Sequence, residues 1–412
     1  MNAKRIVMAA ATSAVLGGLC FVTSAYGDVS VDNIKCTQRY PWNGLVDIEY
    51  TVACDDPSAD IYVNPIGFNG DEGLTVFMTS LYGDGATNTV RAGTHTMTWN
   101  AQADLGGLYA AKNFSVKIFA GEKLAPYVVI NVSDGNGASN YPIRYSLVGP
   151  DLSDDTCRTT EIWLRLVLPG TFMYGCPPGE VGGFYDAGET YCRATLTQPF
   201  YIGVFEITEA QWYKVHSWSP GGTVPVSDVG FYDIWDYSGG EYGSVRSDSF
   251  FGRLHARTGK TGFMLPSEMQ WEYACRAGTR TALNTGKDIA SSVGDDNMSE
   301  AGRYAANGTT KAKVGSYLPN KLGLYDMHGN VWEICRDRYT IEPYRYDGIT
   351  DYVQAELGES SYSKVVKGGS FHDNARICRS ASRTRHTGGD FSSAGSANHV
   401  GFRVCAPATL HQ

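Results

Sequence analysis

The sequence predicts an α+β domain with much irregular chain, preceded by an all-β sandwich domain. Residues 46–52 and 114–119 alternate apolar and polar side chains, which is typical of half-buried strands. Two helix starts appear later, between glycine-rich stretches. The chain has 48 glycines, 26 tyrosines and 19% charged residues. This composition favours loop-rich domains packed by aromatic side chains over helical bundles.

The N-terminus has the three parts of a secretory signal peptide, which we place at residues 1–27. A positive region at residues 4–5 precedes an apolar run over residues 6–22, and small residues at positions 25 and 27 match a cleavage site. A membrane anchor is the alternative, but the run is only modestly apolar and contains a glycine pair. We therefore expect an exported protein that is periplasmic, at the cell surface or extracellular. No later segment is apolar enough to span a bilayer.

The net charge of −9 becomes −11 when the two positive charges of the signal peptide are lost. An acidic protein without a basic run is a poor binder of nucleic acids. Nine of the ten cysteines follow residue 27, and an oxidising compartment allows several disulfides. The odd number leaves at least one thiol free or paired between chains. No CxxC motif is present, which argues against a structural zinc site.

Residues 28–150 are predicted to form the sandwich, of the immunoglobulin or fibronectin type, because short strands alternate with turn signals. Cys36 and Cys54 could clip two neighbouring strands there. This segment contains no catalytic constellation, and we interpret it as a spacer or adhesion module. We place the domain boundary between a polar loop at residues 133–140 and a polar break at residues 151–155.

Capping boxes predict two helices, because in each box a hydroxyl and a glutamine satisfy free backbone N–H groups reciprocally. One helix begins at Thr208 and the other at Ser267, and Gly278 stops the second. Ser247 is predicted to cap a third helix that runs to Arg257. The chain between helices is mostly irregular, so buried aromatic side chains, ions or disulfides must stabilise it.

Six motifs follow one another through the C-terminal part of the chain. They are PGTFMYG at 169–175, PFYIGVFEIT at 199–208, MLPSEMQWEYA at 264–274, LGLYDMHGNVWE at 322–333, KGGSF at 367–371 and GFRV at 401–404. Together they resemble the formylglycine-generating-enzyme family, also called the sulfatase-modifying-factor family, over residues 155–409. The resemblance implies a variant of the C-type-lectin fold, which mixes α and β structure with much irregular chain.

Active enzymes of this family oxidise a sulfatase cysteine to formylglycine with oxygen. They use two cysteines a few residues after GGSF to bind Cu(I), an ion that soft thiolates suit. In this chain the motif is followed by His372, Asp373 and Asn374, and the next cysteine is Cys378. The copper pair is therefore expected to be absent, and copper is not expected as a cofactor. The resemblance implies instead that Cys378 forms a structural disulfide with Cys275.

The resemblance places Trp332 and Ser370 near the active cleft, and with His372 they are the candidate catalytic residues. The alternative is that Trp332 packs in the core and Ser370 follows a tight turn. His372 and Asp373 could serve a hard metal such as Fe(II) in a two-histidine, one-carboxylate site. The sequence places no second histidine beside them, so the favoured interpretation is that they are ordinary loop residues.

A calcium site is also implied by the resemblance. Its four predicted ligands are Asp326 and Glu333 through carboxylates and Gly329 and Val331 through backbone carbonyls. Calcium accepts several oxygens in flexible geometry, which suits a turn that presents carbonyls inward. The alternative is that Asp326 caps a turn while Glu333 pairs with an arginine such as Arg379 or Arg383.

Two further clusters are candidates for structural or binding roles. Cys176 and Cys192 bracket a variable loop and could close it with a disulfide. Arg383, Arg385 and His386 form a small positive cluster, which is usually a solvated face but could receive an acidic ligand.

The motifs favour an oxidative or protein-modifying enzyme of unknown substrate that is not a standard formylglycine-generating oxidase. The first alternative is an extracellular module that binds a protein, peptide or glycan on a lectin-like fold. Such a module could be a diversified variable protein, because residues 372–400 are rich in the residue types of adaptable loops. The second alternative is a catalytically inactive surface scaffold.

Overall fold

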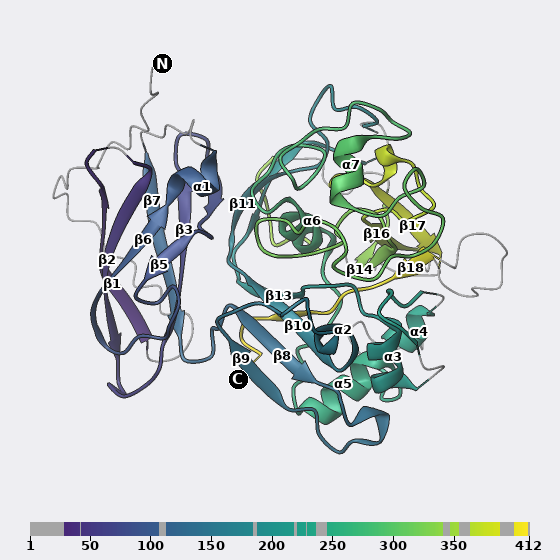
Figure 1. The fold of residues 1–412 in the computed structure, drawn as a ribbon, viewed down its shortest axis with the longest axis horizontal. Helices are drawn as coiled ribbons and strands as arrows, with labels where there is room; N and C mark the ends of the chain where they lie inside the picture. Colours follow the sequence, from purple (N-terminus) through teal and green to yellow (C-terminus); the bar gives the residue numbers. More distant parts are fainter. Residues whose placement is uncertain are drawn as a thin grey trace. The chain divides into compact units, whose positions relative to one another are not determined.

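A computed structural model describes most of the chain as two compact units (Figure 1). The described residues are 29–41, 43–106, 113–183, 188–217, 221–227, 229–235, 245–340, 347–353, 363–387 and 399–410. The first unit comprises Met1–Pro126 and Tyr145–Val148, and the second comprises Tyr127–Arg144 and Gly149–Gln412. The predicted signal peptide lies outside the described residues.

The first unit is a two-layer β-sandwich, as predicted. One sheet has the order β1-β2-β6-β5 and the other β4-β3-β7, with every described pair antiparallel. The strands are β1 (Val29–Gln38), β2 (Leu45–Cys54), β3 (Tyr62–Asn69), β4 (Leu74–Phe77), β5 (Leu81–Gly83), β6 (Gly93–Asn100) and β7 (Phe114–Gly121).

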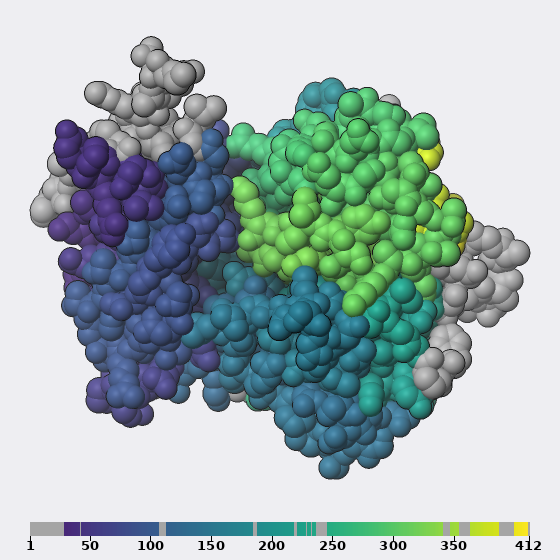
Figure 2. All heavy atoms as spheres, in the orientation of Figure 1, coloured from purple at the N-terminus to yellow at the C-terminus, as the bar shows by residue number. Residues whose placement is uncertain are grey.

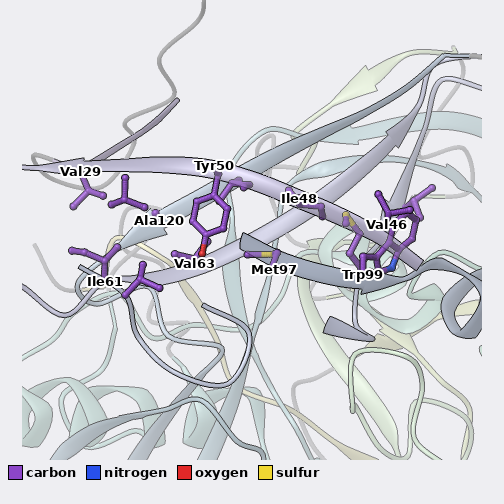
Figure 3. Close-up of a cluster of buried hydrophobic side chains, with 14 of the residues drawn as sticks. Val29, Val46, Ile48, Tyr50, Ile61, Val63, Met97, Trp99 and Ala120 are labelled. Atoms are coloured by element: carbon purple, nitrogen blue, oxygen red, sulfur yellow. The ribbon is translucent and has the colours of Figure 1, made fainter. Parts of the chain in front are cut away.

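Alternation along the strands creates the core of the sandwich. In β2, Val46, Ile48, Tyr50 and Val52 are all buried, while the residues between them are more exposed. Figure 3 shows Val46, Ile48 and Tyr50 pointing between the two sheets, where they meet residues of β3, β6 and β7. The period of two read from the sequence therefore places one face of each strand inward.

A buried carboxylate holds the end of β6 and the short helix that follows it, α1 (Ala101–Leu105). Asp104 accepts hydrogen bonds from the backbone N–H and hydroxyl of both Thr79 and Ser80, and from the indole N–H of Trp99 at 2.7 Å. Burial alone would raise the pKa of Asp104, but the hydrogen bonds from Trp99, Ser80 and Thr79 outweigh it and lower that pKa. The ionised carboxylate thus ties three segments together.

The predicted disulfide between Cys36 and Cys54 is wrong. The register of β1 and β2 pairs Cys36 with Ile48 and Cys54 with Val29. The two cysteines therefore lie about six residues apart along the ladder, roughly 20 Å, whereas a disulfide joins Cα atoms within about 7 Å. Sequence spacing suggested adjacent strands, but it did not specify the register between them.

The second unit mixes α and β structure with much irregular chain, which agrees with the predicted fold class. Its sheets have the orders β19-β13-β10-β8-β9, β11-β12-β15 and β17-β16-β14-β18. The strands are β8 (Tyr127–Asn131), β9 (Ile143–Ser146), β10 (Glu161–Val167), β11 (Gly170–Tyr174), β12 (Cys192–Leu196), β13 (Phe200–Gly203), β14 (Trp332–Arg338), β15 (Ile349–Thr350), β16 (Ser363–Lys367), β17 (Arg383–Thr387), β18 (Val400–Gly401) and β19 (Cys405–Pro407).

The division between the units differs from the boundary expected from sequence. Strand β8 precedes residue 133, yet it pairs with β10 of the second unit, for example at Asn131 opposite Glu161. Its residues Val128, Val129 and Ile130 are all buried. A fully apolar run does not reveal which sheet it joins, so the polar signals predicted a boundary between residues 133–140 and 151–155, after β8 rather than before it.

Short helices complete the second unit. They are α2 (Thr156–Thr159), α3 (Glu209–His216), α4 (Phe231–Ile234), α5 (Phe250–Thr258), α6 (Glu268–Arg276) and α7 (Asp296–Ala301), with 3₁₀ turns at Gly135–Gly137 and Ala375–Ile377. In Figure 2 the green segments, which are mostly irregular chain, form much of the visible face of this unit.

The capping boxes at Thr208 and Ser267 are both confirmed. The third helix begins two residues later than predicted, because Ser249 rather than Ser247 accepts the hydrogen bond from the Gly252 backbone. Helix α6 buries eight of its nine residues and lies inside the second unit, surrounded by irregular chain (Figure 1).

Asp104→Asn should destabilise the first unit, because an amide cannot accept all five hydrogen bonds and places its own N–H₂ against donors. We expect a loss of about 2–4 kcal/mol in the free energy of unfolding, measured by urea denaturation of the full chain. Asp56→Asn is the matched control, since Asp56 is exposed and its carboxylate accepts hydrogen bonds from the neighbouring Ser58. Equal stability of the two variants would contradict the structural role.

Candidate functional site

A network of buried charges joins α6 to strands β16 and β17. Lys367 Nζ lies 2.9 Å from Glu272 Oε2 and 4.0 Å from Glu268 Oε1. Arg383 donates to both oxygens of Glu268, and Arg276 donates to Glu272 Oε1 at 2.9 Å. All five side chains are buried, and a buried charge is tolerated only when it is paired and hydrogen-bonded. The network therefore sets the position of both strands against the helix.

A second buried cluster is centred on Arg379. Arg379 donates to Glu180 Oε1 at 2.6 Å and to both oxygens of Glu189 at 2.9 Å. It also donates to the Cys176 sulfur at 3.5 Å. This cluster attaches the loop after β11 to the segment before β17, and it neutralises the charge of Glu189.

A cavity of about 470 Å³ lies between these two clusters. It is lined by Glu189, Trp332, Tyr339, Val366, Asp373, Ile377, Ser382, Arg383, Thr384, Arg385, His386 and Val400. Trp332 thus lines the cavity. Ser370 is not in the lining, but it orients the lining residue Asp373 by donating its hydroxyl and backbone N–H to Asp373 Oδ2 at 2.5 and 3.0 Å. His372 is exposed and is not among the lining residues.

The glycine pair before Ser370 is required by this geometry. Gly368 and Gly369 have φ values of 92° and 74°, a left-handed region that favours glycine. A Cβ on Gly369 would lie 2.6 Å from the Cys378 sulfur. The turn therefore packs directly on Cys378, whose own sulfur lies 3.8 Å from the Ser370 carbonyl.

A second histidine, His399, lies beside His372 in the structure, and the sequence alone did not indicate that the two are neighbours. The ring of His399 lies 4.1 Å from that of His372, and the Phe371 ring lies 4.4 Å from His372 and 4.8 Å from His399. The three rings pack on one another. Among the residues that the structure describes, no group of three or more His, Cys, Asp or Glu side chains is arranged to hold a metal.

The described cysteines are free thiols, so the predicted Cys275–Cys378 bridge is not formed in this structure. Both residues lie against His328. The Cys275 sulfur is 4.0 Å from His328 Nε2, and the Cys378 carbonyl is 2.6 Å from His328 Nδ1. Burial raises the pKa of Cys275 to about 12 and that of Cys378 well above its usual value. Protonated buried thiols are poor nucleophiles and poor metal ligands.

His328 is itself a structural residue. Its Nε2 accepts a hydrogen bond from the Asn284 backbone at 3.0 Å, so Nδ1 carries the proton and donates to the Cys378 carbonyl. Burial lowers the pKa of His328 to about 4, which keeps the ring neutral.

The predicted Cys176–Cys192 bridge is likewise not formed. Cys192 lies opposite Tyr174 in the β11–β12 ladder, whereas Cys176 lies two residues beyond that pair. The Cys176 sulfur contacts the Arg379 guanidinium and, at 3.4 Å, Glu180 Oε1. The charged cluster therefore stabilises the base of the loop.

The predicted calcium residues are buried together. Asp326 Oδ2 accepts a hydrogen bond from the Gly315 backbone at 2.6 Å, while its buried Oδ1 has no hydrogen-bond partner. Both oxygens of Glu333 are bound by Arg403, at 2.6 and 2.7 Å, and one also accepts from the indole N–H of Trp271. An arginine does pair with Glu333, but it is Arg403 rather than Arg379 or Arg383.

Sequence reasoning missed a third carboxylate in this group. Glu206 is fully buried and accepts hydrogen bonds from the Asn330 side chain at 2.7 Å and the Val331 backbone at 3.0 Å. Burial, and then the charges of Asp326 and Glu333, raise its pKa well above the usual value. An acid within the apolar run Val204–Ile207 was the available signal.

Three carboxylates and two arginines, Arg403 and Arg158, leave an excess of negative charge in this group. Burial raises the pKa of Asp326 to about 6, and the Gly315 hydrogen bond and the two arginines offset this only in part. The unpartnered oxygen of Asp326 and the surplus of carboxylates fit the donor chemistry of a calcium ion.

The family-model comparison agrees with this fold and these motifs. The model described as "Sulfatase-modifying factor enzyme 1-like domain" matches residues 152–408. The chain therefore belongs to the sulfatase-modifying-factor family of formylglycine-generating-enzyme-like proteins.

Known relatives match only part of the chain. The formylglycine-generating enzymes of Thermomonospora curvata and Mus musculus are 30% and 31% identical over 163 and 157 residues, which is 35% of this chain and 50% and 39% of theirs. Chaperone protein LppX of Paenibacillus barcinonensis is 28% identical over 192 residues, 38% of this chain and 69% of its own. The chain thus spans half or less of the two enzymes.

Solved structures of similar proteins include PvdO from Pseudomonas aeruginosa and variable protein 1 of Treponema denticola. They are 22% and 20% identical, cover 60% of this chain and 94% and 96% of their own, and both have a TM-score of 0.47. Within the described residues, no helix of this protein has the length and apolarity that crossing a bilayer requires.

Lys367→Met should be strongly destabilising, because it leaves Glu272 Oε2 buried without its cation and leaves Arg276 as the one described cation on this carboxylate. We expect a loss of about 3–5 kcal/mol in the free energy of unfolding, measured by chemical denaturation. Lys287→Met is the matched control, since the Lys287–Glu300 pair is exposed and exposed pairs contribute little. A Lys367→Met protein as stable as the control variant would rule out the network as the anchor of β16.

Proposed function

We propose that this chain is an exported protein whose second unit binds a ligand in the cavity beside Trp332 and does not act through a copper-thiolate pair. The first unit serves as a spacer or adhesion module. The observation that carries the proposal is the composition of the cavity, whose lining contains no cysteine. Residues 372–374, where the first copper cysteine is expected, contain no cysteine, and their Asp373 is hydrogen-bonded by Ser370.

The remaining cysteine of this segment does not supply the missing chemistry. Cys378 is completely buried, and its sulfur contacts the Ser370 carbonyl rather than the cavity. Its raised pKa keeps the thiol protonated. A reactive cysteine needs an accessible, electropositive environment that lowers its pKa, and this one has the opposite.

A relative with a non-enzymatic name supports the binding interpretation. The relative from Paenibacillus barcinonensis is called a chaperone protein and matches over 69% of its length. The cavity volume also falls in the range of small-ligand sites, about 300–1,000 Å³. The family scaffold can therefore be used for recognition, with the loops around β14, β16 and β17 forming the binding surface.

We further propose that calcium binds at Asp326 and stabilises the turn that precedes β14. Asp326 Oδ1, the carbonyls of Gly329 and Val331 and the carboxylate of Glu333 are the proposed ligands. Glu206 adds negative charge beside them. Such an ion would neutralise the surplus carboxylates and keep Trp332, which directly follows the turn, in place.

The ligand-binding function is tested by two parallel measurements on the purified mature protein. Glycan and peptide arrays should show specific hits that are lost when Trp332 is changed to Ala, whereas the matched variant Trp212→Phe, far from the cavity in α3, should retain them. Anaerobic Cu(I) titration and incubation with a sulfatase-type cysteine peptide should show neither stoichiometric copper uptake nor formylglycine. Turnover of that peptide would reject the proposal.

Calcium should raise the melting temperature, and Asp326→Asn should abolish that effect while Asp296→Asn on α7 should not. At a calcium concentration a hundredfold above the dissociation constant, the expected stabilisation is about 2.7 kcal/mol. The measurement is differential scanning calorimetry with and without a chelator. An Asp326→Asn protein that still responds fully to calcium would place the ion elsewhere.

The calcium effect should grow between about pH 5 and pH 7. The pKa of Asp326 is raised to about 6 in the folded protein, so calcium competes with a proton below that pH. Without calcium, the same raised pKa means that stability is highest below the unfolded pKa of about 4 and falls as the pH rises through 6. Calorimetry across this range, with and without calcium, should show the two trends diverging.

A further inference from the structure

We propose that the cavity selects small ligands that join an apolar body to an oxyanion, such as a carboxylate, sulfate ester or phosphate ester, and that Arg385 pairs with the oxyanion. This inference rests on the proposed binding function and names the ligand class for the same cavity. Three independent properties of the lining carry it: its charge balance, its hydrogen-bond donors and its apolar wall.

The charge balance leaves one lining cation without a counter-ion. The guanidinium of Arg383 donates hydrogen bonds to Glu268 and to the Thr340 carbonyl. Burial lowers the pKa of His386, which keeps its ring neutral. Arg385 is exposed at the cavity, and its side chain makes no hydrogen bond or ion pair with any described residue. Among the described residues, its guanidinium is therefore the lining cation that no carboxylate pairs with.

One lining acid remains without a cation among the described residues. Both oxygens of Glu189 are bound by Arg379, but Asp373 is bound by the neutral Ser370 through one oxygen, and its other oxygen has no hydrogen bond in the described structure. The charge of Asp373 disfavours a ligand with two negative charges. The ligand expected in this cavity therefore carries a single negative charge and a hydrogen-bond donor for Asp373.

Neutral hydrogen-bond donors also line the cavity. Ser382 and Trp332 are 2% and 9% exposed as residues, and neither side chain has a hydrogen bond to any described residue. The hydroxyls of Tyr339 and Thr384, also in the lining, have none either. An indole N–H and a guanidinium can only donate, so a ligand that pairs with them offers acceptor oxygens.

Part of the lining is apolar. Val366, Ile377 and Val400 line the cavity together with the Trp332 ring, and all of them except Ile377 are buried. A ligand with only an oxyanion, such as free sulfate, would leave this wall in contact with water. An aryl or alkyl body removes the wall from water, which contributes about 25 cal/mol per Å² of apolar surface buried.

The test compares matched probes that differ in one group. Phenylacetate, phenyl sulfate and phenyl phosphate are titrated into the mature protein by calorimetry and by ligand-observed NMR, with neutral phenylacetamide as the reference probe. We expect the singly charged anions to bind at least about tenfold more tightly than phenylacetamide, because hydrogen bonds to charged groups are the strong ones. Arg385→Gln should abolish that preference, and Arg385→Lys should retain part of it.

Arg376→Gln is the control variant, because it removes the same charge from an exposed residue that does not line the cavity. It should leave the anion preference unchanged, and thermal melting should show all three variants folded. Equal binding of phenylacetamide and the anions, no binding of any anion, or unchanged anion affinity in Arg385→Gln would each overturn the inference.

The outcomes separate this inference from the proposed function. A neutral glycan or peptide that binds in the cavity with no anion preference would retain the binding function and reject the oxyanion class. Anion binding that depends on Arg385, followed by chemical conversion of the anion, would retain the ligand class and reject a purely binding role.

Discussion

The buried ammonium group of Lys367 is the constraint on which the second unit depends. A cation completely removed from water must keep its carboxylates close, and Glu272 and Glu268 both come from one helix. Helix α6 therefore cannot shift relative to β16 without exposing an unpaired charge. Arg383 extends the same constraint to β17, and the cavity lies beside that strand.

The proposed binding site is thus built on rigid elements rather than on its loops. Trp332 starts β14, Val366 lies in β16 and Arg385 lies in β17, and these three strands are neighbours in one sheet. The family's oxidase chemistry depends on two thiolates after the GGSF motif. In this chain the glycine turn is present, and residues 372–374, which follow the motif, contain no cysteine. Among them, Asp373 is hydrogen-bonded to Ser370.

Local patterns in the sequence predicted the structure well, and non-local relations were the source of error. The capping boxes at Thr208 and Ser267 depend on four consecutive residues, so they could be read directly. The β1–β2 register depends on how two strands slide past each other, so Cys36 and Cys54 were paired incorrectly. Strand β8 was predicted to belong to the first domain for a similar reason, since its apolar residues suit a sheet of either unit.

The site itself was predicted in part. Trp332 and Ser370 were placed near the cleft by the motifs, whereas His399 beside His372 and Glu206 beside Asp326 come from segments far away in sequence. Burial decides their chemistry, and burial is a property of the assembled fold. The partner of Glu333 shows this well: the sequence suggested Arg379 or Arg383, but Arg403 binds both of its oxygens.

The pairing of Arg379 with Glu180 and Glu189 spans 199 and 190 residues of chain. Contacts of such high sequence separation close large loops and form slowly during folding. The last described strand, β19, adds to this by pairing with β13 some 200 residues earlier. During synthesis, the cavity can therefore appear only after the whole second unit has left the ribosome, so a nascent or C-terminally shortened chain would have no pocket with which to capture a ligand.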